Sequence, residues 1–184
     1  MSEDLPYLHE PTEESSRILS YQDAQRLIRE YREQGIRVVL VHGVFDVLHI
    51  GHVSFFEEAK SDGGVLLVGI ENDQGVRLNK GDTRPYFDTS TRLKMLSALR
   101  LVDHVFAFED AIRYSEEPDL WTNRYAQLQP EYVGVSAWDP NFDMKRQQAE
   151  SVGVRLLPIS VRRLTSSTRL IEEDIIGQEE ANDF

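Results

Sequence analysis

Two histidines three positions apart, His49 and His52, are the side chains whose type and spacing point most clearly to chemistry. They follow an apolar run at 38–41 and a turn at Gly43, and a helical pattern begins at about His52. Both rings would then lie on one side of the first helical turn, beside free N–H groups and the positive end of the helix dipole. Gly51 leaves space between them for a phosphate to approach. The pattern therefore predicts an anion site.

Residues 43–52 carry a longer pattern than the histidine pair. Gly43-Val44-Phe45-Asp46 followed by His49-Ile50-Gly51-His52 resembles the signature of the HIGH-motif nucleotidyltransferase superfamily. Its small members include glycerol-3-phosphate cytidylyltransferase and the adenylyltransferase domain of the bifunctional ADP-heptose synthesis protein. The resemblance extends over roughly residues 38–171. It implies that His49 and His52 are catalytic and that the nucleotide contacts Gly43, Val44, Phe45, Asp46 and Gly51.

Two cations further along the chain are candidates for phosphate contacts. The stretch at 80–85, with the sequence Lys-Gly-Asp-Thr-Arg-Pro, resembles a segment of the heptose adenylyltransferase domain, which implies a catalytic Lys80. We expect residues 77–85 to form a polar loop, and a solvated run of charges is the alternative role for its cations. Arg92 lies in the first turn of a helix that Asp88 can cap, where the dipole disfavours a cation unless an anion is near. The resemblance assigns Arg92 a phosphate contact there.

Two stretches near the end of the pattern complete the expected nucleotide site. Ser166-Ser167-Thr168 resembles the family's second signature, in which hydroxyls and N–H groups at a helix start hold the triphosphate. A plain helix cap is the alternative. Trp138 keeps the aromatic residue that relatives place near the base and substrate. Ser136 and Ala137, however, stand where relatives often have a Gly-Asp pair, so the base is left open.

Other kinds of site fit the sequence less well. His42, His49 and His52 could together bind zinc, but the chain has no cysteine and we expect no protein-bound metal. A dinucleotide site is not indicated either, because the first turn lacks the Gly-x-Gly-x-x-Gly pattern.

The elements that must position these residues alternate between strand and helix. Apolar runs at 38–41, 65–70, 102–108, 131–135 and 154–158 suit buried parallel strands, with helical patterns between them. We predict an α/β fold: a Rossmann-like, open, parallel five-stranded sheet with helices on both faces. Residues 20–184 would form one domain, after an acidic and poorly ordered tail at 1–19. Ligands of such sheets bind at the carboxyl edge.

Composition limits the partners that can be expected. The chain has 20 basic and 32 acidic residues and a net charge of −12, which argues against binding nucleic acid or an anionic membrane. It has no cysteine, its first residues lack a basic signal region, and no apolar run approaches the ~20 residues of a membrane span. We therefore expect a cytoplasmic protein.

The resemblance also implies a reaction. A nucleoside triphosphate, bound with Mg²⁺, and a phosphorylated sugar or polyol would be the substrates, and pyrophosphate would be released. ATP is favoured over CTP, because residues 71–108 look most like the heptose adenylyltransferase domain. A homodimer is expected on the same grounds. The alternative is a non-catalytic nucleotide-binding or scaffold protein that has retained the fold.

Overall fold

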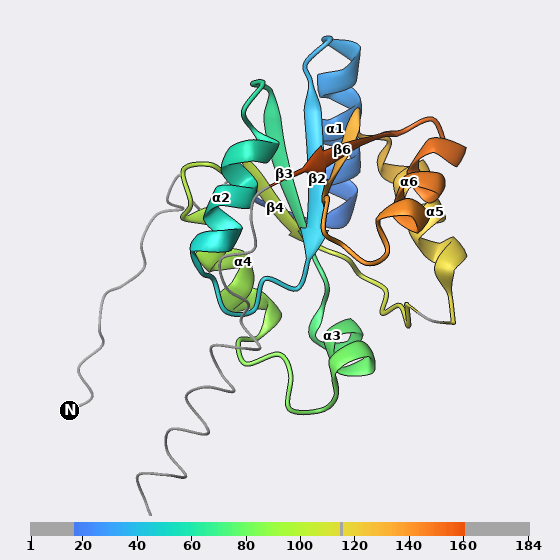
Figure 1. The fold of residues 1–184 in the computed structure, drawn as a ribbon. Coiled ribbons are helices and arrows are strands. Elements are labelled where there is room, and N and C mark those ends of the chain that lie inside the picture. The colour runs from blue at the N-terminus through green and yellow to red at the C-terminus, as the bar shows by residue number, and fades with distance from the viewer. Residues whose placement is uncertain (1–16, 115, 161–184) are drawn as a thin grey trace, which may run out of the picture.

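One parallel sheet organises the chain. The computed structural model describes residues 17–114 and 116–160, and these form a six-stranded sheet in the order β1-β4-β3-β2-β5-β6 (Figure 1). All five strand pairings are parallel. The strands are β1 (Ile18–Leu19), β2 (Val38–Gly43), β3 (Val65–Ile70), β4 (His104–Ala107), β5 (Tyr132–Ser136) and β6 (Arg155–Ile159).

Helices cover both faces of this sheet, as the sequence predicts. One core layer packs against α1 (Tyr21–Glu33), α5 (Pro118–Leu128) and α6 (Phe142–Ser151). The other packs against α2 (Ile50–Ala59) and α4 (Thr89–Ser97). The remaining helix, α3 (Asp73–Lys80), lies beyond the carboxyl edge of the sheet, away from both layers (Figure 1). No helix among the described residues combines the length and apolar character that crossing a bilayer requires.

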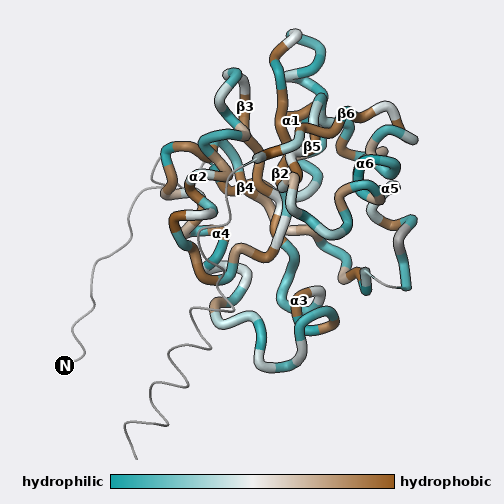
Figure 2. The backbone as a smooth tube through the Cα atoms, in the orientation of Figure 1, coloured by the Kyte–Doolittle hydropathy of each residue, from teal (hydrophilic) through white to brown (hydrophobic). Residues whose placement is uncertain are grey.

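The central strands form because their side chains are apolar on both faces. Residues 38–41 of β2 and 66–70 of β3 are buried without exception. Figure 2 shows these strands as hydrophobic segments inside a more hydrophilic shell of helices and loops. Such continuous apolar runs are typical of parallel strands with helices on either side, which is why the sequence predicted the fold class correctly.

Two helix starts follow from side-chain caps that the sequence predicts. Ser20 accepts a hydrogen bond from the Asp23 N–H at the start of α1, and Asp88 accepts one from the Thr91 N–H at the start of α4. A third cap, on Asn72, starts α3 by accepting from the Gly75 N–H. Residues 77–80 are therefore helical, and the expected loop over 77–85 begins only after Lys80.

The prediction of five strands is wrong by one. Ile18 and Leu19 pair with Val105 and Phe106 to make an additional edge strand, β1. A two-residue strand is too short to show an alternating pattern, so no feature of the sequence indicates it. The prediction of a poorly ordered tail falls, for residues 1–16, outside the part of the chain that the structure describes.

The strand order places a topological switch point beside β2. The chain moves from β2 to β3 and β4 on one side, and then crosses to β5 and β6 on the other. The loops that follow β2 and β5 consequently leave the carboxyl edge of the sheet toward opposite faces. Ligands of open α/β sheets bind at this position.

Candidate functional site

The turn after β2 delivers the two histidines to the first turn of α2. His49 is the N-cap residue, and its carbonyl accepts the His52 N–H at 2.9 Å. The two rings stack with centroids 3.8 Å apart. Phe45, whose φ of +48° turns the chain, lies edge-on to His52 at 5.3 Å. The predicted juxtaposition of His49 and His52 at a helix start is therefore present.

Both histidines keep hydrogen-bonding capacity that no described residue uses. Their Nδ1 atoms are buried without a partner. Burial lowers the pKa of His49, and burial together with the charges of His49 and Lys80 lowers the pKa of His52 to about 4. His52 is then neutral near pH 7, and a neutral imidazole still offers one N–H donor. The Nε2 atoms are not among the buried atoms and have no partner among the described residues, so they are the ring nitrogens that an anion at this helix N-terminus could meet.

Lys80 adds a positive charge to this site. It is the last residue of α3, and within residues 17–114 and 116–160 no hydrogen bond or ion pair occupies its ammonium. Its charge contributes to the lowered pKa of His52, so the ammonium lies close enough to that ring to act on it electrostatically. The residue is exposed overall, yet its charged end is crowded: burial and then Arg84 lower the pKa of Lys80, while Asp46 opposes them. An unpaired cation thus lies in the electrostatic neighbourhood of the neutral His52 ring.

Asp46 is buried and supports the site through hydrogen bonds to a neighbouring loop. Its carboxylate accepts the N–H groups of Tyr86 and Phe87 at 2.9–3.0 Å, and it pairs with Arg84 at 3.0 Å. It is only 6% exposed. These bonds join the turn after β2 to residues 84–87. Asp46 therefore contributes to the site by holding a loop, and Arg84 is a member of the site for which the sequence indicated no role.

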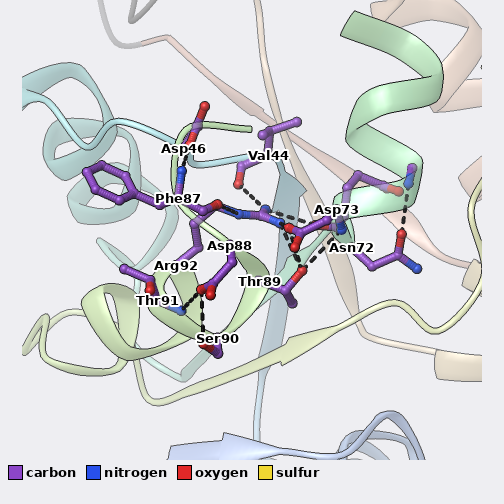
Figure 3. A network of polar contacts seen from close by, with 12 residues as sticks. Val44, Asp46, Asn72, Asp73, Phe87, Asp88, Thr89, Ser90, Thr91 and Arg92 are labelled. Carbon is purple, nitrogen blue, oxygen red and sulfur yellow. Dashed lines mark hydrogen bonds and ion pairs between the residues drawn. The ribbon is translucent and has the colours of Figure 1, made fainter. Parts of the chain in front are cut away.

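Arg92 does not have the role that the resemblance implies. Its side chain is 0% exposed. All five of its N–H donors are occupied, by Val44 O, Glu71 O, Phe87 O, Asp73 Oδ1 and Thr89 Oγ1 at 2.7–3.1 Å (Figure 3). A phosphate cannot reach this guanidinium, so the predicted contact is corrected. The anion that makes a cation acceptable in this first turn is Asp73.

The glycines and Val44 shape the turn between β2 and α2. A side chain at Gly43 would come within 3.2 Å of the Phe45 ring, so a larger residue would displace that ring from His52. The Gly43 carbonyl accepts the Glu71 N–H at 3.0 Å, and the Val44 carbonyl accepts from Arg92. Gly51 lies between the histidines within α2.

The other predicted nucleotide contacts lie across the switch point or outside the described residues. Trp138 follows β5 and is 67% exposed, a suitable position for stacking on a base at the carboxyl edge. The backbone N–H of Trp138 donates to Ser136 Oγ at 3.3 Å. Ser166, Ser167 and Thr168 belong to residues 161–184, which the structure does not describe.

A second polar cluster borders the site and was missed by sequence analysis. Glu71, at the end of β3, is fully buried and pairs with Arg124 of α5 at 2.9 Å. Burial raises the pKa of Glu71 against the opposing effect of Arg124. His42 is also engaged here: it stacks on Trp121 at 3.9 Å and hydrogen-bonds Tyr125 at 2.7 Å. Pairing across so many positions leaves no local signal in the sequence.

The zinc alternative finds no support in this arrangement. His42 hydrogen-bonds Tyr125 and stacks on Trp121, whereas His49 and His52 stack on each other. Within the part of the chain that the structure describes, no three His, Cys, Asp or Glu side chains are grouped as metal ligands.

The fold and this site together define a class of protein: an open α/β domain with unpartnered histidines at a helix start beside its switch point. Comparison with known families agrees with that assignment. The chain belongs to the cytidylyltransferase-like family of nucleotidyltransferases, whose model matches residues 40–173.

Its relatives include proteins of greater length. The chain is 38% identical over 120 residues to the bifunctional protein HldE of Wolinella succinogenes, covering 62% of this chain and 25% of that protein. It is 29% identical over 168 residues to HldE of Desulfatibacillum aliphaticivorans, covering 89% and 32%. The chain thus spans about a quarter to a third of the length of these curated relatives.

Solved structures show the same fold. The lipopolysaccharide core biosynthesis protein from Thermoplasma volcanium matches with a TM-score of 0.56 and 25% identity, over 70% of this chain and 99% of that one. Pantoate-beta-alanine ligase from Francisella tularensis matches with a TM-score of 0.62 over 84% and 72% of the two chains. At 17% identity the second likeness concerns the fold alone.

Proposed function

We propose that this protein transfers a nucleoside monophosphate from a nucleoside triphosphate to a phosphorylated sugar or polyol. The observation that carries the proposal is the set of unpaired donors on His49, His52 and Lys80 at the switch point. Three neighbouring groups that can donate to phosphate, and that no described residue engages, suit a triphosphate. Membership of the cytidylyltransferase-like family supports the same reaction class.

The chemistry proposed is an in-line substitution at the α-phosphorus. An oxygen of the acceptor phosphate forms a bond to the α-phosphorus as the bond to the bridging oxygen breaks, and pyrophosphate leaves with the electron pair. The acceptor needs no general base, because a phosphate monoester with a second pKa of about 6 is mostly dianionic near neutral pH. Catalysis then consists of alignment and stabilisation of charge on the five-coordinate phosphorus.

Each side chain has a distinct part in this reaction. His49 and His52 donate to oxygens of the α- and β-phosphates, and Lys80 neutralises charge as the pyrophosphate separates. Anionic phosphate beside His52 would raise the pKa of that ring from about 4, since a nearby negative charge favours the imidazolium. The site can therefore take up a proton as the triphosphate binds.

Mg²⁺ is proposed to enter as part of the nucleotide substrate. The described residues offer no cluster of three ligands, and the Asp46 carboxylate is already engaged by Arg84 and two N–H groups. Triphosphate oxygens and water would hold the ion, as is common for Mg²⁺ at nucleotide sites. The residues named above are thus left to bind phosphate directly.

ATP is the nucleotide that we propose, with CTP as the other possibility. Support comes from the HldE proteins, at 38% and 29% identity, and from the resemblance of residues 71–108 to the adenylyltransferase domain. The lipopolysaccharide core biosynthesis protein among the structural relatives fits an acceptor built on a sugar.

The proposal is tested by a pyrophosphate-release assay over the four common nucleoside triphosphates and a panel of sugar and polyol phosphates. The product is identified by mass spectrometry as a nucleotidyl diphosphate conjugate. A variant carrying both His49→Ala and His52→Ala serves as the matched control. Turnover by the wild type but not by this control is expected.

Two other outcomes would count against the proposal. Nucleotide binding without pyrophosphate release from any pair would favour a non-catalytic binding or scaffold protein. Equal turnover in the wild type and the double variant would show that the chemistry occurs elsewhere.

A further inference from the structure

We propose that Arg92 is a positioning residue that holds Lys80 opposite the histidine pair. It bonds to all three backbone segments that carry these groups, and it touches no substrate itself. The inference rests on the proposed function, because that function assigns His49, His52 and Lys80 to the reacting phosphates.

The acceptors of Arg92 lie where the segments meet. Nη1 donates to Val44 O, in the turn that leads to His49, and to Glu71 O, at the end of β3, both at 2.8 Å. Nε donates to Phe87 O, in the loop between Lys80 and α4, at 2.9 Å. Figure 3 shows the guanidinium between these segments. One planar group therefore connects the turn between β2 and α2 to both ends of the segment 71–87, which contains α3.

A second set of bonds closes that segment at its base. Asp73, at the start of α3, accepts from Arg92 Nη2 at 2.7 Å, while its N–H donates to Thr89 Oγ1 at 3.1 Å. Thr89 in turn donates to Asp73 at 2.8 Å and accepts from Arg92 at 3.1 Å. Residues 73–89 are thus pinned at both ends around Arg92, and Lys80 lies within them.

Asp46, in the turn between β2 and α2, holds the same loop after Lys80. It accepts the Tyr86 and Phe87 N–H groups, so Phe87 is held by Asp46 through its N–H and by Arg92 through its carbonyl. Since α3 lies beyond both core layers (Figure 1), these bonds add to the burial of Val76 in fixing the segment that carries Lys80. Residues 112–114 hold the end of α3 as well: Asn79 donates to Ile112 O at 2.6 Å and accepts the Tyr114 N–H at 3.0 Å, and Arg113 donates to Leu78 O at 3.4 Å.

The geometry requires a guanidinium and not simply a positive charge. Five donors in one plane serve five acceptors from separate segments, whereas an ammonium has three donors and no fixed plane. Arg92→Lys therefore keeps the charge but releases at least two acceptors. Lys80 should then move relative to the histidines, and small displacements of reacting groups can cost up to about a hundredfold in rate.

The experiment compares Arg92→Lys with Lys60→Met. Lys60 follows α2 at the opposite end of that helix from His49 and His52, pairs with Asp103 at 2.6 Å, and takes no part in the site. The measurements are thermal midpoint, kcat and nucleotide Kd for both variants. We expect Arg92→Lys to lower kcat at least about tenfold with a smaller change in Kd, and Lys60→Met to keep kcat within about twofold.

Chemical rescue separates positioning from general loss of structure. Guanidinium at millimolar concentration should restore part of the kcat of Arg92→Ala, whereas ammonium or sodium chloride at equal ionic strength should not. If Arg92→Ala does not fold, Arg92→Lys decides alone. A kcat for Arg92→Lys within twofold of Lys60→Met, at a similar thermal midpoint, would overturn the proposal.

A separate readout covers failure of the proposed function. If the wild type releases no pyrophosphate from any pair, the acylation rate of Lys80 relative to Lys94 is measured by peptide mass spectrometry. Burial of its ammonium and the charge of Arg84 lower the pKa of Lys80, which raises the fraction of reactive free amine. Positioning by Arg92 predicts that this ratio falls in Arg92→Lys; an unchanged ratio would contradict it.

Discussion

Lys80 and Arg92 are two cations at the ends of one loop, and their surroundings are opposite. Lys80 is exposed and has no hydrogen bond or ion pair within the described residues, whereas Arg92 is fully buried with every donor occupied. A cation that must bind a substrate gains by having no internal partner to displace. A cation that must hold a fold together gains by saturation, because an unpaired buried charge is costly. Occupancy of donors, more than charge, distinguishes binding from positioning here.

The largest expected effect is the loss of kcat when a histidine of the site is replaced. Like the Lys80 ammonium, the two histidine rings have no hydrogen-bond partner among the described residues. His49→Ala and His52→Ala should each lower kcat about a hundredfold or more, the scale for losing one preorganised donor to a transition state. Neither ring has a hydrogen bond to lose in the folded protein, so the thermal midpoint should change little. Nucleotide Kd should change less than kcat. Two variants with near wild-type kcat would show that these donors are not catalytic.

Substitution of Arg92 should lower the free energy of unfolding much more than substitution of Lys80. Arg92→Met leaves Asp73 and three carbonyl groups without their partner, so the free energy of unfolding should fall by about 3–5 kcal/mol. Lys80→Met should change it by no more than about 0.5 kcal/mol, as is usual for an exposed and unpaired side chain. Urea unfolding followed by circular dichroism measures both. Equal losses in the two variants would remove the distinction drawn above.

The same comparison explains what could be predicted from the sequence. His49 and His52 were found because their spacing is local: a helix places residues three apart on one side, whatever the rest of the chain does. The strands were found because burial on both faces leaves a continuous apolar run. Ser20 and Asp88 predicted the starts of their helices because an N-cap residue bonds to an N–H only three residues away.

Roles that depend on distant pairing could not be predicted in this way. Arg92 bonds to Val44 and Glu71, and Asp46 bonds to residues 84–87, across gaps that leave no periodic signal. A family pattern assigns Arg92 a phosphate because it records residue type and position, but occupancy of the five donors appears only in three dimensions. The Glu71–Arg124 pair escaped notice for the same reason.

Acidification should weaken the folded protein through His52. The folded-state pKa of His52 is lowered to about 4 from an ordinary value near 6.5, so the unfolded chain binds the proton first. Stability is therefore complete above about pH 6.5 and is lost as the pH falls toward 4, by roughly 2–3 kcal/mol for this group.

The pH dependence can be assigned to His52 by substitution. His52→Gln should reduce the slope of the unfolding free energy against pH between 6.5 and 4, measured by urea titration at each pH. The pKa values of His42, His49 and His104 are also lowered, so part of the slope should persist. An unchanged slope in His52→Gln would mean that the ring is not held neutral.

The smallest expected effect concerns Trp138, on the far side of the switch point from the histidines. The indole is 67% exposed and its ring has no described aromatic or cationic neighbour, so its removal should leave the thermal midpoint unchanged. If the ring stacks on the base, Trp138→Ala should weaken nucleotide binding by about 1 kcal/mol, close to fivefold in Kd. kcat at saturating nucleotide should be nearly unaffected, because the base is remote from the α-phosphorus. Isothermal titration with ATP and CTP measures the loss for each nucleotide. Stacking tolerates any base, so similar losses for both would place selectivity in other groups, whereas no loss for either would remove Trp138 from the nucleotide site.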